Sequence, residues 1–282
     1  MDNSTRPHYH HLKEKWTAKN KSLQARLWDK HKDSLSQLAI GSLSGLMMLS
    51  SPGISQLSPS QLSVIQEAPI SKHAFLVADL SHVLPKEMRP LSEEEEKKVS
   101  DVFSRYFSFK AIAELDGKKL NRSYGLIGQE QHLARYPGDN LGSHFDSEGQ
   151  AQQFASQGMA PGLGAFGYFV PSKQHLTEKD NLREKYYIAV QTFLVPDYVQ
   201  RLAEYRDFFR FRKMLVVNPQ NGQAVVAVIG DAGPGEFTGK HLGGSPEVMR
   251  HLERVDGSMR GPVIYFFIDD PNDTIPLGPV NL

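Results

Sequence analysis

The chain reads Met214-Leu-Val-Val-Asn-Pro-Gln-Asn-Gly-Gln-Ala-Val-Val-Ala-Val-Ile-Gly-Asp-Ala-Gly-Pro234 in its last third. Two apolar runs in this stretch, Met214–Val217 and Ala224–Ile229, have the length and the valine content of buried strands. The connection between them contains Asn221-Gly222, a pair typical of tight hairpins because both residue types adopt a positive φ readily. We therefore predict a β-hairpin whose second strand leads directly to Asp231.

Asp231 is the main candidate for a catalytic residue. It follows a continuous apolar strand and lies among small residues, Gly230 and Ala232-Gly-Pro234. Burial against apolar strands raises the pKa of a carboxyl group, because desolvation disfavours its charged form. A carboxyl group that stays protonated near neutral pH can donate its proton to a glycosidic oxygen. A structural interpretation stays open beside this one, because Asp before Gly-Pro is also common in turns.

The composition excludes several classes of function. The chain has 282 residues, with 32 basic and 32 acidic side chains and no cysteine. A net charge of zero gives no overall field that would attract nucleic acid, so we predict no nucleic-acid partner. Disulfides and thiol catalysis are excluded, and a zinc site would need histidine and carboxylate ligands.

The first ninety residues divide into three predicted segments. Residues 1–34 form a basic polar tail, residues 35–50 an uncharged hydrophobic segment, and residues 51–90 a linker rich in Ser, Pro and Gln. A basic flank before a short apolar run is typical of an export signal or an anchor. We therefore expect an exported protein of the cell envelope or the extracellular space, with membrane association through residues 35–50. An amphipathic helix is the alternative for that segment.

Residues 91–282 are predicted to form one domain, mainly β with peripheral helices. The capping box Ser92-Glu-Glu-Glu95 predicts a helix over about 92–108, and Ser245-Pro-Glu247 predicts the start of a short helix. Many short strands with few helices favour a small closed barrel. The predicted strands are Ile112–Leu115, Ser123–Ile127, Gly167–Val170, Tyr186–Phe193, Met214–Val217, Ala224–Ile229 and Val263–Ile268.

Residues 213–268 resemble the double-psi β-barrel domain of the RlpA (rare lipoprotein A) family and its expansin and cell-wall 3D relatives. The shared features are, in chain order, Asn218-x-x-Asn221-Gly222, the strand Val225–Ile229, Asp231-x-Gly233-Pro234, the segment Ser245–Leu252 and the strand Gly261–Ile268. The resemblance implies a six-stranded double-psi β-barrel, preceded here by the predicted helix and the hydrophobic segment. It further implies a lytic transglycosylase that cleaves the glycan strands of peptidoglycan, with Asp231 as general acid and base.

The chain departs from the family pattern at two positions. Ala232 stands where the family has Arg, and Gln191 stands where the upstream strand of the family has His. An insertion, Pro196–Phe211, separates that strand from the hairpin. These departures favour an alternative hypothesis, in which the barrel is a non-catalytic, expansin-like module that binds the cell wall.

Polar and aromatic residues between Ser123 and Asp139 form the second part of the predicted site. A hydrolase would need a second carboxylate across the scissile bond. Glu130 is the preferred candidate, with Asp139 and Glu236 as alternatives. Aromatic faces and polar groups together bind sugars, and the predicted substrate-binding residues are His132, Tyr136, Asp139, Tyr168, Gln191, Lys240 and His241.

A zinc-dependent peptidoglycan peptidase is the third hypothesis. Its ligands would come from His132, His144, Asp146, His175 and His241, but no pair of these has a diagnostic spacing. Glycan cleavage by Asp231 needs neither a metal nor an organic cofactor. We therefore expect no cofactor.

Overall fold

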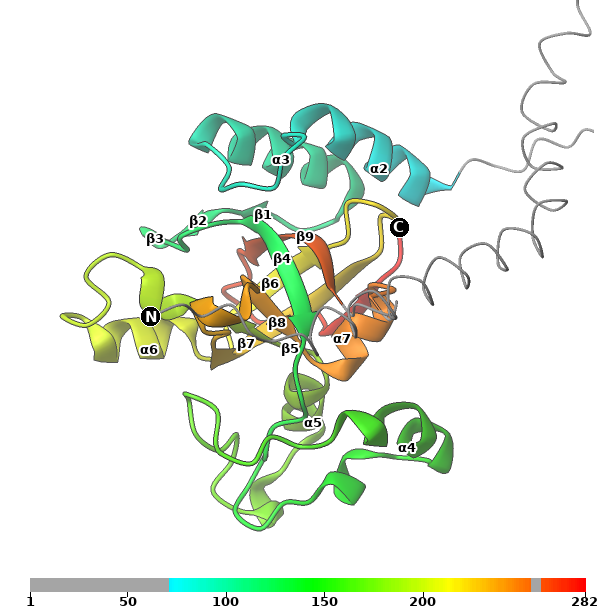
Figure 1. The fold of residues 1–282 in the computed structure, drawn as a ribbon, viewed down its shortest axis with the longest axis vertical. Coiled ribbons are helices and arrows are strands. Elements are labelled where there is room, and N and C mark those ends of the chain that lie inside the picture. The colour runs from blue at the N-terminus through cyan, green and yellow to red at the C-terminus, as the bar shows by residue number, and fades with distance from the viewer. Residues whose placement is uncertain (1–70, 255–259) are drawn as a thin grey trace, which may run out of the picture. The chain divides into compact units, whose positions relative to one another are not determined.

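The computed structural model describes residues 71–254 and 260–282, which form a β-barrel with helices on its outside (Figure 1). The predicted basic tail and hydrophobic segment, residues 1–50, lie outside the described residues. Within the described part of the chain, no helix has the length and apolar character needed to cross a membrane.

Six strands close into the barrel. The ring runs β4–β9–β6–β7–β5–β8 and returns to β4. The β4–β8 and β5–β7 pairs are parallel and the other four are antiparallel, so the barrel is mixed and compatible with the predicted double-psi topology. The six strands are β4 (Tyr124–Gln129), β5 (Tyr187–Val190), β6 (Lys213–Val217), β7 (Ala224–Ala232), β8 (Leu242–Gly244) and β9 (Arg260–Ile268).

The predicted hairpin is confirmed. β6 and β7 are antiparallel, with Val217 paired with Ala224. The turn is closed by hydrogen bonds from the Gly222 N–H to the Asn218 carbonyl and from the Asn218 N–H to the Gln223 carbonyl, both 2.9 Å. Gly222 has a φ of 76°, which explains the glycine at this position.

Alternation along the strands divides the apolar side chains between two cores. Val225, Ala227 and Ile229 of β7 point into the barrel, whereas Val226 points outward. The outer face of β6, β7 and β9 is covered by α2 (Lys72–Val83) and α3 (Glu93–Tyr106). The predicted capping box at Ser92 and Glu95 is present at the start of α3. Helix α2 lies within the segment interpreted as a linker and was not expected.

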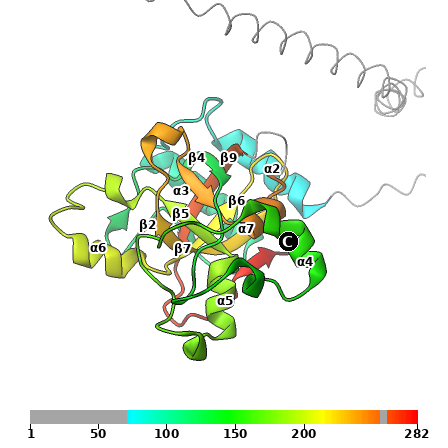
Figure 2. The same cartoon turned by 60° about the horizontal axis from the view of Figure 1, so that its bottom comes forward.

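Residues 130–186 leave the barrel after β4 and return to it at β5. We call this segment the lobe; it lies below the barrel in Figure 1 and comes forward in Figure 2. It contains η2 (Leu141–His144), α4 (Glu148–Phe154), η3 (Ala155–Gln157), η4 (Lys173–His175) and α5 (Glu178–Lys185). The remaining elements are β1 (Ala111–Ile112), β2 (Glu114–Leu115), β3 (Lys118–Lys119), η5 (Thr192–Leu194), α6 (Leu202–Phe209), η6 (Glu236–Thr238), α7 (Pro246–His251) and β10 (Gly278–Val280).

Three strand predictions need correction. Gly167–Val170 is not a strand: Gly167 has a φ of 76°, and the segment is irregular with a bend at Phe169, whose side chain packs against the barrel. The strand predicted over Tyr186–Phe193 ends at Val190. A short 3₁₀ helix follows it and begins at Thr192. The predicted strand Ile112–Leu115 is divided between β1 and β2.

Gly230 allows close contact between β7 and the ring of Tyr187. A Cβ atom at position 230 would lie 2.7 Å from the Tyr187 Cβ, which cannot rotate away. We expect Gly230→Ala to lower the free energy of unfolding by roughly 1–3 kcal/mol, as overpacked cores do. Urea denaturation of the purified protein measures this. Gly162→Ala is the matched control, because nothing lies within 4 Å of its added Cβ; equal losses for both variants would contradict the steric explanation.

Candidate functional site

The candidate site lies on the outer face of three neighbouring strands. Ala189 of β5 pairs with Gly243 of β8 on one side and with Asp231 of β7 on the other. The residues on either side of Ala189, Ile188 and Val190, belong to the barrel interior, so Ala189 and its partners face outward. A register shift between Ile188 and Ala189 gives Asp231 this outward position.

The Asp231 carboxyl group is partly buried and held by backbone donors. Its Oδ1 accepts hydrogen bonds from the N–H of Ala165, at 2.6 Å, and from the N–H of Ala232, at 2.8 Å. Gly164 brings the lobe close, because a Cβ there would lie 3.2 Å from the same oxygen. Burial raises the pKa of Asp231, and the two N–H donors oppose this rise only in part. Asp231 therefore has the environment expected of a general acid.

The Glu130 carboxylate lies on the same outer face. It extends over Gly243, where an added Cβ would come within 2.3 Å of Glu130 Oε1. Oε1 lies 2.5 Å from the Nζ of Lys240, which also donates to the Gln129 carbonyl at 3.1 Å. Glu130 thus has a cationic partner, whereas the hydrogen bonds to Asp231 come from neutral N–H groups.

Gln191 is buried and positions the loops around the site. Its side-chain Nε2 donates to the carbonyl of Pro234 at 3.0 Å and to the carbonyl of Lys240 at 3.3 Å. These contacts connect the end of β5 to the segments after Asp231 and before β8. We predicted that Gln191 binds substrate, but its amide holds the backbone in this structure.

His241 and Tyr168 lie at the edges of this region. The His241 Nδ1 accepts a hydrogen bond from the Leu126 N–H at 3.0 Å, and burial lowers the pKa of this histidine. Tyr168 is half-buried, and its carbonyl accepts a hydrogen bond from Arg210 at 3.0 Å. Neither side chain is shown to interact with Asp231 or Glu130.

Three other predicted substrate-binding residues belong to the interior of the lobe. The relative exposure of His132 is 0% and that of Tyr136 is 4%, and the side chain of Asp139 is 0% exposed. Asp139 forms an ion pair with Arg135 at 2.9 Å. The side chains of His132, Tyr136 and Asp139 are therefore too deeply buried to contact a substrate on the surface. Glu236, the third alternative for the second carboxylate, is exposed.

His132 and Asp139 take part in a polar network that also includes His144 and Glu184. The Glu184 carboxylate lies between the two histidines, with Oε1 3.2 Å from His132 Nδ1 and Oε2 3.0 Å from His144 Nδ1. Although burial alone would raise it, the hydrogen bonds from both histidines lower the pKa of Glu184 to about 2. Sequence reasoning missed Glu184, which no local motif marks.

Among the described residues, His132, His144 and Glu184 form the group that could hold a metal ion. The other predicted zinc ligands lie elsewhere. Asp146 is exposed and pairs with Lys185, and His175 is exposed beside the Ser172 hydroxyl.

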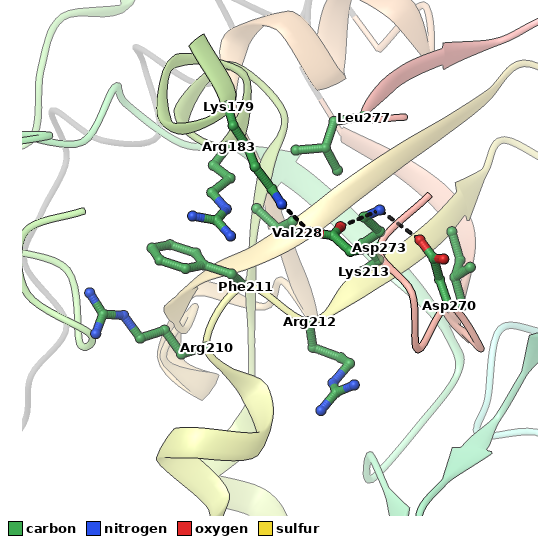
Figure 3. Close-up of a pocket in the computed structure, with 11 residues that line it drawn as sticks. Lys179, Arg183, Arg210, Phe211, Arg212, Lys213, Val228, Asp270, Asp273 and Leu277 are labelled. Atoms are coloured by element: carbon green, nitrogen blue, oxygen red, sulfur yellow. Dashed lines mark hydrogen bonds and ion pairs between the residues drawn. The ribbon is translucent and has the colours of Figure 1, made fainter. Parts of the chain in front are cut away.

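Three cavities on the described surface have volumes of about 170, 360 and 350 Å³, and neither Asp231 nor Glu130 lines any of them. Figure 3 shows the first, where arginines surround Phe211 and Lys213 contacts Asp270 at 2.7 Å and Asp273 at 2.6 Å. The candidate site thus lies outside these three cavities.

No family model matches the chain, and no curated protein sequence matches it.

The buried position of Asp231 predicts a pH-dependent effect on stability. Its pKa is higher in the folded state than the unfolded value of about 3.9. Its stabilising contribution is therefore complete below the unfolded pKa and is lost as the pH rises through the folded pKa. Asp231→Asn keeps the oxygen that accepts both N–H bonds and removes the charge.

We therefore expect Asp231→Asn to be more stable than the wild type at pH 7, with the difference shrinking as the pH falls towards about 4. Urea unfolding at both pH values measures this. Asp207→Asn, at an exposed position, serves as the control. A difference that is the same at both pH values would show that ionisation of Asp231 is not its cause.

Proposed function

We propose that this protein is a peptidoglycan-cleaving enzyme of the cell envelope, built on a double-psi β-barrel, with Asp231 as its general acid and base. One observation carries the proposal: a partly buried carboxyl group with a raised pKa stands at the end of a barrel strand, where the sequence motif places it. Glycan strands of peptidoglycan are the proposed substrate. Export is proposed on residues 35–50 alone, which lie outside the described residues.

The environment of Asp231 suits a lytic transglycosylase reaction. Among the described residues both hydrogen bonds to the carboxyl group go to Oδ1, and we propose that Oδ2 is the atom that carries the proton. The protonated carboxyl gives its proton to the glycosidic oxygen as the bond to the anomeric carbon breaks. The resulting carboxylate then takes the proton of the 6-hydroxyl group as that oxygen bonds to the anomeric carbon. The products are a free hydroxyl and an anhydro sugar, and no water is consumed.

Glu130 is proposed to stabilise positive charge on the sugar or to activate water. Ala189 lies between Gly243 and Asp231, its partners on the two adjacent strands, and the Glu130 carboxylate lies over Gly243. Two strand spacings of about 4.8 Å separate their backbones by roughly 10 Å. Paired carboxylates of glycosidases lie at roughly 5–9.5 Å. The backbone separation is thus near the upper end of that range, which supports placing the two carboxylates at opposite sides of one sugar ring.

A non-catalytic, wall-binding module is the second candidate function. The observation that favours it is the buried Gln191 side chain, which stands where the resembled family has a histidine and which bonds to two carbonyl groups. Such a module would keep the outer face of the barrel without bond cleavage.

Incubation of the full chain with purified peptidoglycan, followed by mass spectrometry, tests the proposed activity. We expect anhydro-muropeptides from the wild type. Asp231→Asn should reduce their formation at least about 100-fold, as loss of a general acid does, while binding to peptidoglycan persists. Asp207→Asn is the matched control. Binding without products from the wild type would support the wall-binding module, and reducing ends would indicate a hydrolase.

The role of Glu130 is tested by two independent changes. Glu130→Gln removes the charge, and Gly243→Ala displaces the carboxylate, because the added Cβ would occupy its place. We expect each to lower the rate of product formation roughly 10–100-fold, with circular dichroism unchanged. Gly162→Ala is the control for the glycine change. Wild-type rates in both variants would leave Asp231 as the single catalytic carboxylate.

A further inference from the structure

The lobe has little hydrophobic core. Of the residues between 130 and 186, four apolar side chains are buried, and five polar or charged side chains are buried with them. The apolar set is Leu133, Tyr136, Phe166 and Phe169, and the polar set is His132, Arg135, His144, Asp180 and Glu184. Small folding units with so few apolar contacts are commonly stabilised by a disulfide or a metal ion. The chain has no cysteine, so a disulfide is excluded.

Three of these polar residues bring metal-ligating atoms together from separate parts of the lobe. His132 follows β4, His144 ends η2, and Glu184 lies in α5. Their ligand atoms all lie within 4.8 Å of one another, and each carboxylate oxygen of Glu184 lies 3.0 or 3.2 Å from a histidine Nδ1. Ligands bound to a tetrahedral zinc ion at about 2.0–2.1 Å are about 3.3 Å apart, which is close to the two nitrogen–oxygen distances.

A carboxylate lies beside the second ring nitrogen of His144. The His144 Nε2 lies 3.1 Å from Asp139 Oδ2. Arg135 fixes this carboxylate through its Nε at 2.9 Å and one terminal nitrogen at 3.0 Å. A neutral histidine whose Nε2 proton faces a carboxylate presents a lone pair at Nδ1, and this orientation is characteristic of carboxylate–histidine–metal arrangements.

The contact between His144 Nδ1 and Glu184 Oε2, at 3.0 Å, has a length that suits either a hydrogen bond or two ligands of one cation. The Nε2 atoms of His132 and His144 are buried, and neither has a hydrogen-bond partner among the described residues.

We propose that His132, His144 and Glu184 bind a zinc ion that fastens the lobe, with Asp139 and Arg135 orienting His144. Two imidazoles and one carboxylate are a ligand set that zinc accepts, and a water molecule is the remaining ligand. The three side chains are at most 1% exposed, so no peptide substrate reaches the ion. The role of the site is structural, and it does not depend on the proposed glycan cleavage.

The experiment measures zinc bound to the full chain. All proteins in this experiment carry the substitutions His8→Ala, His10→Ala and His11→Ala, because those three histidines could bind zinc independently of the cluster. After metal depletion, reloading and gel filtration, we expect about one zinc per chain by mass spectrometry of the metal. His144→Ala and Glu184→Gln should retain less than a tenth of this amount, and the matched variants His175→Ala and His241→Ala should keep all of it.

A second measurement keeps the test decisive if a variant unfolds. A zinc chelator should lower the thermal unfolding midpoint of the wild type by several degrees, and added zinc should restore it. Asp139→Asn, which leaves all three ligands in place, should weaken zinc affinity about 10–100-fold. A folded wild type that retains no zinc and whose midpoint is unchanged by chelator would overturn the proposal and assign a second proton to His144 instead.

Discussion

A one-residue register shift between β5 and β7 determines where the candidate acid lies. Ile188 pairs with Ile229, but the next residue of β5, Ala189, pairs with Asp231 rather than with Gly230. With regular alternation Asp231 would share the inward face of Ile229, because side chains two residues apart point to the same side. A carboxyl group in that apolar interior would be strongly destabilising. The shift turns it outward, and Gly230 makes this possible by leaving room for Tyr187.

The parts of the fold that the sequence predicted are those with local causes. The Asn221-Gly222 turn, the α3 capping box and the Pro246 helix start each act within a few residues, and all three are present. The predicted strand at Gly167–Val170 was wrong because its aromatic and β-branched residues have the composition of a strand. Phe169 instead packs from a bend against Tyr187 and Val228, which the local sequence does not reveal.

For the candidate site too, the sequence indicated the residues that have a local signal and missed those that do not. Polar residues at strand ends, Asp231 and Glu130, could be recognised from the pattern around them. Glu184 could not, because it lies in the charged segment Glu178–Lys185, which resembles a solvated helix. Its burial results from partners 40 and 52 residues away. The same long-range contacts remove His132 from the surface, where a polar residue near glycines would be expected.

The lobe and the barrel depend on each other at Asp231. One of the two hydrogen bonds that hold its carboxyl group comes from Ala165 of the lobe, at 2.6 Å. Tyr187 makes the second connection: its ring packs beside Gly230, and its hydroxyl donates to the carbonyl of Gln131, the residue before His132. A well-ordered lobe therefore fixes the orientation of the Asp231 carboxyl group and limits its hydration. This desolvation raises the pKa of Asp231. The lobe buries few apolar side chains, so the polar cluster around Glu184 forms a large part of its interior.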